Sequence, residues 1–421
     1  MQQKFDIAVV GGGASGLAAA LAALRRGREA GRRPAVAVVE KNPRVGKKLL
    51  MTGNGRCNLT NRNAGPARYH GDAAQAAAVL EGCTPQELLN RFRALGLFCR
   101  ELEDGRLYPY SLQASAVLNV LRRALQSAGG AELCGLPVES VRKSGDGFTL
   151  SAGETRLFAR RVIVATGGKA CPQSGSSGDG YALLAPFGHS VTGLRPALVQ
   201  IRTEPARTRS LHGVRCEAGV LLTAGGRTVA SSRGEVQFAQ GALSGICIFD
   251  LSRYVDRPSG MELSLDLAPE FSGEKLADFF AAQAKAAPAC PAGSVPEGLL
   301  PKALAAETEK AAGIAPAAAA SAPSAEDWGR LAATVKRFRF PVLGTLSWQN
   351  AQVTAGGIPL AETDGGLQSR KCAGIYLCGE ILNLDGGCGG YNLHWAWASG
   401  IAAGHAAADS LTHVRTGGSG G

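Results

Sequence analysis

The sequence predicts an α/β protein in which a nucleotide-type domain is interrupted by a long insertion. Two observations carry this prediction: a glycine-rich turn that joins a short apolar strand to an alanine-rich helix, and short buried strands that return late in the chain. Residues 5–10 and 35–40 have the apolar runs of buried strands, and residues 13–24 have the pattern of the helix between them. These three elements form one β-α-β unit.

Further strands are expected at residues 162–166 and 374–378, on either side of a long middle region. The first part of that region has short β-like runs separated by Gly, Arg and Ser turns, and the second part is helical in pattern and rich in Ala and Pro. We therefore expect four parts: a discontinuous nucleotide-binding domain of residues 1–195 and 344–412, an inserted β-rich subdomain of residues 196–270, an inserted helical subdomain of residues 271–343, and a linker or tag remnant at residues 416–421.

Net charge raises the question of an acidic partner. The chain of 421 residues carries a formal charge of +11, which is typical of proteins that bind nucleic acid or acidic membranes. The excess is local, because eleven Lys and Arg residues lie between Arg25 and Arg62 against only Glu29 and Glu40. We expect part of this window to neutralise the phosphates of a bound dinucleotide, so nucleic acid is not the expected partner.

The cysteine and hydropathy patterns argue against a metalloprotein and a membrane protein. Eleven cysteines are scattered without a CxxC pair, and no histidine joins a cysteine cluster, so we expect no metal site. Unpaired cysteines suit a reducing cytoplasm. The apolar run at residues 7–24 contains three consecutive glycines and is shorter than a membrane span, so we expect neither a signal segment nor a membrane helix.

The turn at residues 11–16 reads GGGASG, which is a GxGxxG pattern. Gly11 allows the tight turn, Gly13 lets backbone approach a pyrophosphate, and Gly16 lets the helix pack on the strand. The helix N-terminus offers N–H groups to phosphates, and Glu40 ends the second strand where it can accept ribose hydroxyls. The alternative, a glycine turn without a ligand, is disfavoured because strand, helix and acidic residue all stand in the expected order.

Residues 52–61 read TGNGRCNLTN and are dense in turn formers and amide side chains. Such a loop can approach a planar ring with its backbone and donate hydrogen bonds to ring carbonyls. Arg56 could hold an anionic group in a bidentate manner, although an ordinary solvated Asn-Gly loop has the same composition. Cys57 lacks the second cysteine of a CxxxxC redox pair, so we expect it to be structural.

A diglycine turn follows the strand at residues 162–166, where it can bring the chain back over a bound dinucleotide. A further glycine-rich turn, residues 386–390, leads into a helix that starts near Tyr391. A helix N-terminus stabilises negative charge, and reduced flavin carries such charge at its N1–C2 edge, so the pair of sites favours FAD over NAD. The alternatives are a plain loop and an amphipathic terminal helix. His394 could deliver a proton near neutral pH, or could simply be packed or exposed.

Four separated segments resemble one family. They are GGGASG with Glu40, GKKLLMTGNGRCNLTN at residues 46–61, VATGGKACPQSGSSGDGY at residues 164–181, and GEILNLDGGCGGYNLHWAWASG at residues 379–400. Together with GEVQFAQGALSG at residues 234–245, they are similar to the BaiN/YhiN-like family of FAD-dependent oxidoreductases, also labelled the aminoacetone oxidase family. Asn383, His394 and Cys247 depart from the residues common in that family, which bears on the substrate and not on FAD binding.

The resemblance implies a glutathione-reductase-like, FAD-binding Rossmann domain that is discontinuous and carries the inserted β-rich and helical subdomains. It also implies where FAD lies, with its pyrophosphate at the GxGxxG turn and its ring near the loop and the late turn. The residues expected to contact FAD are Gly11, Gly13, Ala14, Ser15, Gly16, Glu40, Lys41, Lys48, Gly53, Arg56, Cys57, Asn58, Ala165, Thr166, Gly167, Gly168, Gly379, Glu380, Gly390, Tyr391, Asn392 and Leu393. The residues expected to take part in catalysis are Arg56, Asn58, Tyr391 and His394.

The expected function is NAD(P)H-linked reduction of a conjugated C=C bond in a hydrophobic oxo substrate, such as a bile-acid-like or steroid-like enone, because one branch of the family is linked to that reaction. NAD(P)H would bind transiently, since the chain has no second GxGxxG, and hydride would pass through the flavin to the β-carbon. Two alternatives stay open: an oxidase of a small amine such as aminoacetone that releases hydrogen peroxide, and a flavoprotein that binds RNA or senses redox state. The oligomeric state and the choice between NADH and NADPH are open as well.

Overall fold

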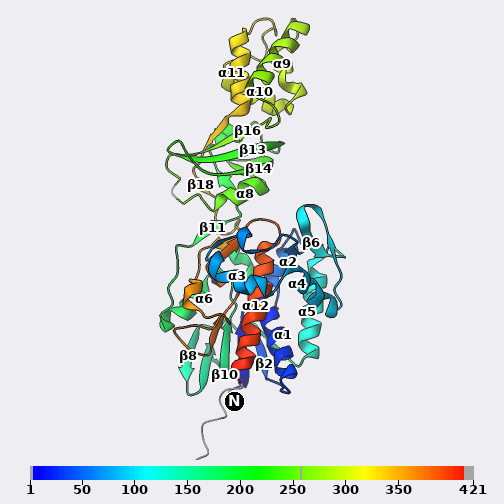
Figure 1. Cartoon of the computed structure of the whole chain (residues 1–421). Coiled ribbons are helices and arrows are strands. Elements are labelled where there is room, and N and C mark those ends of the chain that lie inside the picture. Colours follow the sequence, from blue (N-terminus) through cyan, green and yellow to red (C-terminus); the bar gives the residue numbers. More distant parts are fainter. Residues whose placement is uncertain (1–2, 257, 412–421) are drawn as a thin grey trace, which may run out of the picture. The chain divides into compact units, whose positions relative to one another are not determined.

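The computed structural model describes residues 3–256 and 258–411 and divides the chain into two compact units (Figure 1). The first unit contains the chain up to Arg195 and again from Gln352, and the second unit is Pro196–Ala351. The short strand β11 (Arg195–Ala197) lies where the first unit passes into the second. The tag remnant expected at residues 416–421 lies outside the described residues.

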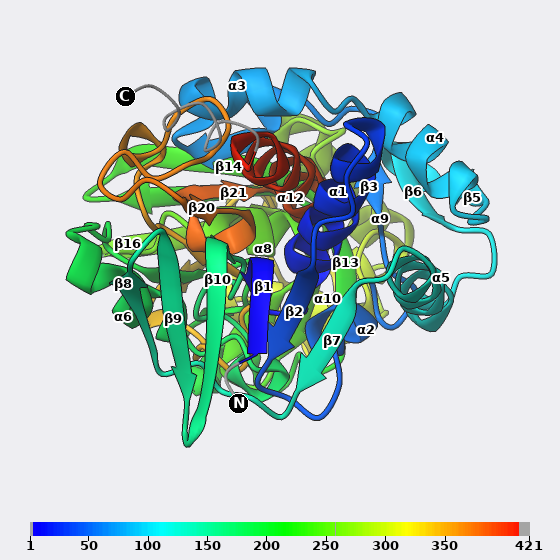
Figure 2. The ribbon, with the colours of Figure 1, turned by 90° about the horizontal axis from the view of Figure 1, so that it is seen from below.

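A seven-stranded sheet forms the centre of the first unit. Strand β1 pairs in parallel with β2 on one side and with β10 on the other, while β7 pairs in parallel with β2 and β20 with β10. An antiparallel hairpin of β8 and β9 extends the sheet beside β10 (Figure 2). The strands of this sheet are β1 (Gln3–Val10), β2 (Val36–Glu40), β7 (Ala131–Cys134), β8 (Ser140–Ser144), β9 (Gly147–Ala152), β10 (Thr155–Val164) and β20 (Ile375–Leu377).

The β-α-β unit predicted from the sequence is confirmed, since β1, α1 (Ala14–Glu29) and β2 follow one another and the two strands are parallel neighbours. The two later strands that we expected are the end of β10 and the strand β20. The remaining elements of the first unit are α2 (Lys47–Met51), β3 (Thr60–Asn61), β4 (Tyr69–Gly71), α3 (Ala73–Glu81), α4 (Pro85–Ala94), β5 (Cys99–Glu101), β6 (Arg106–Pro109), α5 (Ala114–Ser127), α6 (Asp179–Leu184), β19 (Val353–Ala355), β21 (Leu384–Gly386) and α12 (Tyr391–Ser410).

Helices α1 and α12 pack tightly against each other beside the sheet (Figure 2). A Cβ added at Gly400 would lie 2.3 Å from the carbonyl oxygen of Ser15, and one added at Gly404 would lie 2.2 Å from that of Ala19. Only glycine leaves room for this approach of two backbones. Because Gly400 and Gly404 face Ser15 and Ala19 in the same order, the two helices run in the same direction.

The second unit has its own sheet and its own hydrophobic core. The strand order is β17-β16-β13-β14-β15-β12-β18, and the helices α7 to α11 lie between strands along the chain. The elements are β12 (Ile201–Arg202), α7 (Pro205–Thr208), β13 (Arg215–Ala224), β14 (Arg227–Ala239), β15 (Ala242–Ser244), α8 (Ile246–Ser252), β16 (Met261–Asp266), α9 (Gly273–Ala286), α10 (Lys302–Ala312), α11 (Ala325–Lys336), β17 (Phe338–Pro341) and β18 (Gly344–Thr345).

The second unit extends further along the chain than the sequence pattern suggests. We expected the first domain to resume at residue 344, whereas β18 pairs with β12 inside the second unit. The preceding strand β17, in the region expected to be helical, pairs with β16. The first unit resumes only at Gln352, because these two short strands complete the inserted sheet.

We searched the described residues for membrane-spanning helices and for clusters of metal-binding side chains. Within residues 3–256 and 258–411, no helix is long and apolar enough to cross a membrane. Over the same residues, no group of three or more His, Cys, Asp or Glu side chains is arranged to hold a metal ion.

The carboxyl group of Glu309 is buried in the second unit. Glu309 lies on α10, and neither of its carboxyl oxygens has a hydrogen-bond partner. Burial, with a smaller contribution from Glu297, raises the pKa of Glu309 from 4.5 to about 7. The folded chain therefore holds a proton on Glu309 at pH values where the unfolded chain has lost it.

We expect this carboxyl group to make the stability of the second unit depend on pH. Between pH 4.5 and about 7 the folded state binds more protons, so the free energy of unfolding falls as the pH rises through this window. Glu309→Gln should remove this part of the pH dependence and should unfold at higher urea concentration than the wild type above pH 7. Urea titrations on both sides of the window measure this, with the exposed Glu326→Gln as control. Equal pH dependence in wild type and Glu309→Gln would contradict the assignment.

Candidate functional site

The GxGxxG turn has the geometry of a ligand-facing loop at the start of α1. Gly11 has a φ of +107°, and a Cβ there would lie 2.4 Å from the carbonyl oxygen of Ala165. A Cβ at Gly16 would lie 1.9 Å from the carbonyl oxygen of Gly11, so this glycine serves packing. A Cβ at Gly13 would meet no atom within 4 Å. The open space therefore lies at Gly13, the glycine expected to face a pyrophosphate.

Glu40 ends β2 directly beside this turn and is buried. Its Oε2 accepts a hydrogen bond from the N–H of Gly12 at 2.7 Å, and its Oε1 accepts hydrogen bonds from the backbone and side chain of Asn42. A carboxylate oxygen has two lone pairs, so Oε2 keeps capacity for a ribose hydroxyl. Glu40 lines a pocket together with Lys41 and Thr166, and the buried Oγ1 of Thr166 has no hydrogen-bond partner in the described chain.

The two lysines that we expected to contact a cofactor form ion pairs. Lys41 Nζ lies 2.7 Å from Oδ2 of Asp179, which begins α6, and 2.6 Å from the hydroxyl of Ser177. Lys48 Nζ, on α2, lies 2.8 Å from Oε2 of Glu380. The other oxygen of Glu380 accepts the N–H of Thr354 at 3.0 Å. These pairs join the segments around Asp179 and Glu380 to the segment that follows β2.

The loop after α2 is held in an uncommon backbone conformation. Gly53, Asn54, Gly55 and Cys57 all have φ between +54° and +80°, and side-chain-bearing residues rarely adopt such angles. Strained loops of this kind cluster at ligand clamps. Cys57 is fully buried, and burial raises the pKa of its thiol to about 12, which agrees with a structural cysteine.

Asn58 and Arg56 occupy different positions on this loop. Asn58 is buried, and its Oδ1 has no hydrogen-bond partner in the described chain. Arg56 is exposed, and its guanidinium lies 5.2 Å from the centroid of the Tyr108 ring. The two residues therefore offer an unsatisfied acceptor inside the fold and a cation on its surface.

The late glycine-rich turn meets this loop. Gly390 has a φ of +97°, and a Cβ there would lie 2.8 Å from Oδ1 of Asn58 and 2.6 Å from the carbonyl oxygen of Thr60. The side chain of Asn392 closes the turn, with Oδ1 accepting the N–H of Gly386 and Nδ2 donating to the carbonyl of Gly386, both at 2.8 Å. Residues more than 300 positions apart thus form one surface.

Helix α12 begins on this surface. Tyr69 donates its hydroxyl to the carbonyl of Tyr391 at 2.8 Å and fixes the first residue of the helix. No side chain caps the N-terminus of α12 at Gly390, and none caps α1 at Gly13. The first N–H groups of each helix have no partner within the helix, so both ends are suited to bind negative charge.

The two helix ends are staggered along one direction. Gly400, nine residues after the start of α12, faces Ser15, one residue after the start of α1. Eight residues of offset correspond to about 12 Å at the rise of an α-helix. A ligand that contacts both ends must therefore be long, with one anionic group at α1 and a second electron-rich edge at α12.

The residues that we expected to contact FAD fall into three groups, near the start of α1, near Glu380 and near the start of α12. At α1 lie Gly11, Gly13, Ala14, Ser15, Gly16, Glu40, Lys41, Ala165, Thr166 and Gly167. A second group consists of the pair Lys48 and Glu380, of Gly168 beside Glu380, and of Gly379 against Ser15 of α1. At α12 lie Gly53, Arg56, Cys57, Asn58, Gly390, Tyr391, Asn392 and Leu393.

The structure argues against the predicted role of His394 as a proton donor. His394 is fully buried, and its Nδ1 lies 2.8 Å from Oγ1 of Thr60. Burial lowers its pKa to about 4, so the imidazole is neutral at neutral pH. A buried, neutral histidine is a poor proton donor, because its remaining N–H is far less acidic than that of an imidazolium, and its contact with Thr60 joins α12 to β3.

Sequence reasoning missed two arginines at the α12 end. The Nε of Arg106, on β6, lies 3.9 Å from where a Cβ of Gly389 would stand. The guanidinium of Arg68 lies 5.9 Å from the centroid of the Tyr391 ring. Neither arginine belongs to a recognisable motif, and only the folded chain brings them to the turn.

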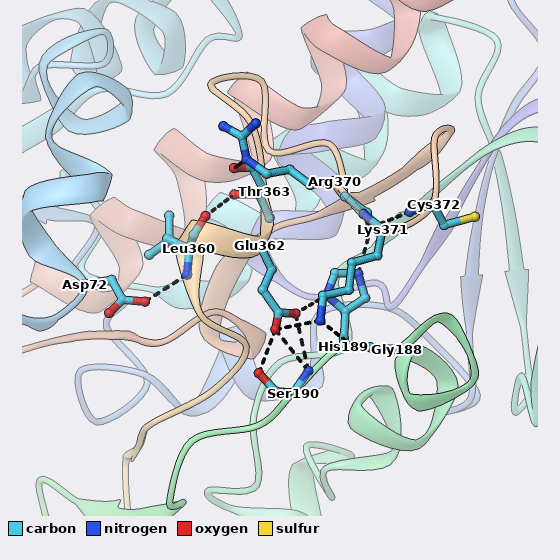
Figure 3. Close-up of polar contacts among 11 residues, drawn as sticks. Asp72, Gly188, His189, Ser190, Leu360, Glu362, Thr363, Arg370, Lys371 and Cys372 are labelled. Atoms are coloured by element: carbon cyan, nitrogen blue, oxygen red, sulfur yellow. Dashed lines mark hydrogen bonds and ion pairs between the residues drawn. The ribbon is translucent and has the colours of Figure 1, made fainter.

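A separate polar cluster of the first unit has a superficial likeness to a hydrolase triad (Figure 3). His189 Nδ1 lies 2.6 Å from Glu362, and its Nε2 lies 2.8 Å from Oγ of Ser369. Burial raises the pKa of Glu362, but hydrogen bonds from Ser190, Lys371 and His189 outweigh it and lower the pKa to about 2. Ser369 is buried and accepts backbone N–H bonds from Lys371 and Cys372. The cluster therefore ties two loops together.

Comparison with known proteins agrees with the fold. The chain matches a family model described as the HI0933-like protein Rossmann domain over residues 5–406. It is 37% identical over 409 residues to the 3-dehydro-bile acid delta(4,6)-reductase of Clostridium scindens, covering 96% of this chain and 99% of that protein. It is 29% identical over 407 residues to the ribosomal RNA dihydrouridine synthase of Escherichia coli, covering 95% and 97%.

A solved structure shares the fold at low sequence identity. The 3-ketosteroid-delta4-(5alpha)-dehydrogenase of Rhodococcus jostii, in complex with 4-androstene-3,17-dione, superposes with a TM-score of 0.52 and 17% identity, covering 96% of this chain and 97% of that chain. The predicted family, the predicted α/β Rossmann fold and the predicted class of FAD-dependent oxidoreductase are confirmed. The family match over nearly the whole chain, together with a relative above 30% identity, leads to one conclusion: this chain belongs to the HI0933-like Rossmann-domain family.

Proposed function

We propose that the protein is an NAD(P)H-linked, FAD-dependent reductase of a carbon–carbon double bond conjugated to a carbonyl group. The observation that carries the proposal is the pair of uncapped, staggered helix N-termini at Gly13 and Gly390. One long ligand with a pyrophosphate at one end and an electron-rich ring edge at the other matches this spacing. Bound FAD supplies hydride transfer.

The residues of the chain hold the cofactor by position and charge. The first N–H groups of α1 bind the pyrophosphate, and Oε2 of Glu40 accepts a ribose hydroxyl. The first N–H groups of α12 stabilise the negative edge of the ring, and the unpartnered Oδ1 of Asn58 accepts a ring N–H. Arg56 and Arg106, two of the cations of that end, bind the carbonyl oxygen of the substrate and polarise its double bond. Water or a side chain completes the reduction with a proton.

The name of a relative supports the substrate class. The Clostridium scindens protein is named for reduction of delta(4,6) bonds in a 3-dehydro bile acid, which is a ketone conjugated with C=C bonds. We propose a hydrophobic oxo compound of this kind as substrate. NAD(P)H binds transiently, because the chain has a single GxGxxG.

A second candidate substrate is a uridine base in RNA. The C5=C6 bond of uracil is also conjugated to a carbonyl, so the same chemistry would give dihydrouridine. The Escherichia coli relative carries that activity in its name. A specific feature of this chain favours RNA as well: two exposed aromatic rings, each with an arginine near its face, flank the strand pair that contains Arg106.

We expect Gly13 and Gly16 to respond differently to the same substitution. Gly13→Val places a side chain in open space at the proposed pyrophosphate site, so the protein should fold and be purified without flavin. Gly16→Val places a Cβ 1.9 Å from a carbonyl oxygen, so it should lower the yield and the thermal midpoint. Flavin absorbance per chain and thermal unfolding distinguish the two. A flavin-loaded Gly13→Val would contradict the proposed pyrophosphate site.

We expect the flavin-loaded protein to be reduced by nicotinamide and reoxidised by an enone. Under anaerobic conditions NADH or NADPH should bleach the flavin absorbance, and a 3-oxo-Δ4 steroid should restore it. The matched saturated 3-oxo steroid is the control and should leave the flavin reduced. Bleaching by aminoacetone, with hydrogen peroxide on admission of oxygen, would support an amine oxidase and contradict the proposal.

A further inference from the structure

Two aromatic rings are unusually exposed on the first unit. Phe98 is 64% exposed and Tyr110 is 62% exposed, the highest values for large hydrophobic side chains among the described residues. The N–H of Tyr110 donates to the carbonyl of Phe98 at 2.8 Å, so the two residues are neighbours. They flank the paired strands β5 and β6. Neighbouring exposed rings form contiguous apolar surface, which is typical of interaction sites.

Each ring carries an arginine. The guanidinium of Arg100 lies 3.8 Å from the centroid of Tyr110, and that of Arg93 lies 5.8 Å from the centroid of Phe98. Within the described chain neither arginine forms an ion pair, and the buried Nε of Arg100 has no hydrogen-bond partner. The surface therefore combines aromatic faces with positive charge that no carboxylate neutralises.

This combination fits unpaired nucleotides better than an apolar ligand or a protein core. Unpaired bases stack on exposed aromatic rings and on guanidinium planes, and the phosphates are attracted by arginine. An apolar steroid would gain nothing from the two cations. A protein partner would need a larger apolar patch, whereas these rings are bordered by arginines.

The surface and the proposed flavin site are linked by one strand. Strand β6 starts at Arg106, beside the turn at Gly389, and leads to Tyr110 four residues later. Four residues of an extended β-strand span about 13 Å, which is comparable to a short stretch of single-stranded RNA. A base at the flavin end would therefore place its neighbours over Tyr110 and Phe98.

We propose that Phe98, Tyr110, Arg93 and Arg100 form a platform that binds unpaired nucleotides of an RNA next to the base that enters the flavin site. The role of the flavin site rests on the proposed function, whereas RNA binding by the platform does not. The proposal departs from the expectation that nucleic acid is not a partner.

The test is fluorescence anisotropy of the flavin-loaded full chain with a labelled single-stranded RNA of mixed sequence, in low and in physiological salt. We expect binding that weakens with salt and is stronger for the single strand than for the matched duplex. Phe98→Ala with Tyr110→Ala should weaken binding by about fivefold to a hundredfold, as expected for the loss of stacking. Arg100→Gln should weaken binding and reduce its salt dependence.

Matched controls separate the platform from general effects. Phe271→Ala removes an exposed ring of the second unit, and Arg32→Gln removes an exposed cation at the far end of α1, so both should bind RNA like the wild type. All variants should keep the flavin content and the flavin bleaching by NAD(P)H of the wild type.

Three results would overturn the platform. They are no RNA binding at low salt, equal binding by wild type and platform variants, and a change in sedimentation of the platform variants with RNA affinity unchanged, which would make the surface a contact between copies of the chain. If the flavin-loaded wild type binds RNA but reduces neither the enone nor uridine, the proposed function is wrong and RNA binding by the platform is still supported.

Discussion

The close packing of α1 against α12 is the interaction on which the proposed site depends. Gly400 and Gly404 let the backbone of α12 touch that of α1 at Ser15 and Ala19, and this contact sets both the direction and the offset of the two helices. Uncapped N-termini that are offset by about 12 Å along the helix direction follow from it. A larger residue at either glycine would separate the helices, and the N-termini of α1 and α12 could then no longer bind the same ligand.

The α12 end is completed by segments that are far apart in the sequence. The strained loop after α2 presents Asn58 to Gly390, and Tyr69 fixes the first residue of α12 through its carbonyl. His394, buried and neutral, joins α12 to β3 from inside. Contacts between distant segments therefore build the site, with Arg56 exposed on the loop and Arg106 beside the turn.

The sequence predicted the β-α-β unit and the glycine turns, because these features depend on residues that are close together in the chain. The β-α-β unit follows from apolar periodicity, and the glycine turns follow from the need for close backbone approach at Gly11, Gly16 and Gly390. The sequence left open whether His394 is packed or delivers a proton, because its burial depends on packing against β3 and not on its neighbours in the chain. Arg68, Arg106 and the late return of the first unit at Gln352 were missed for the same reason, since contacts between distant residues leave no local signal.

The central claim is that one dinucleotide joins the ends of α1 and α12. Identification of the chromophore released from the purified protein by denaturation tests this most directly. The account predicts FAD at one molecule per chain, because only a ligand with a pyrophosphate and an adenosine reaches both helix ends. Release of FMN, which has no adenosine to place beside Glu40, would contradict it.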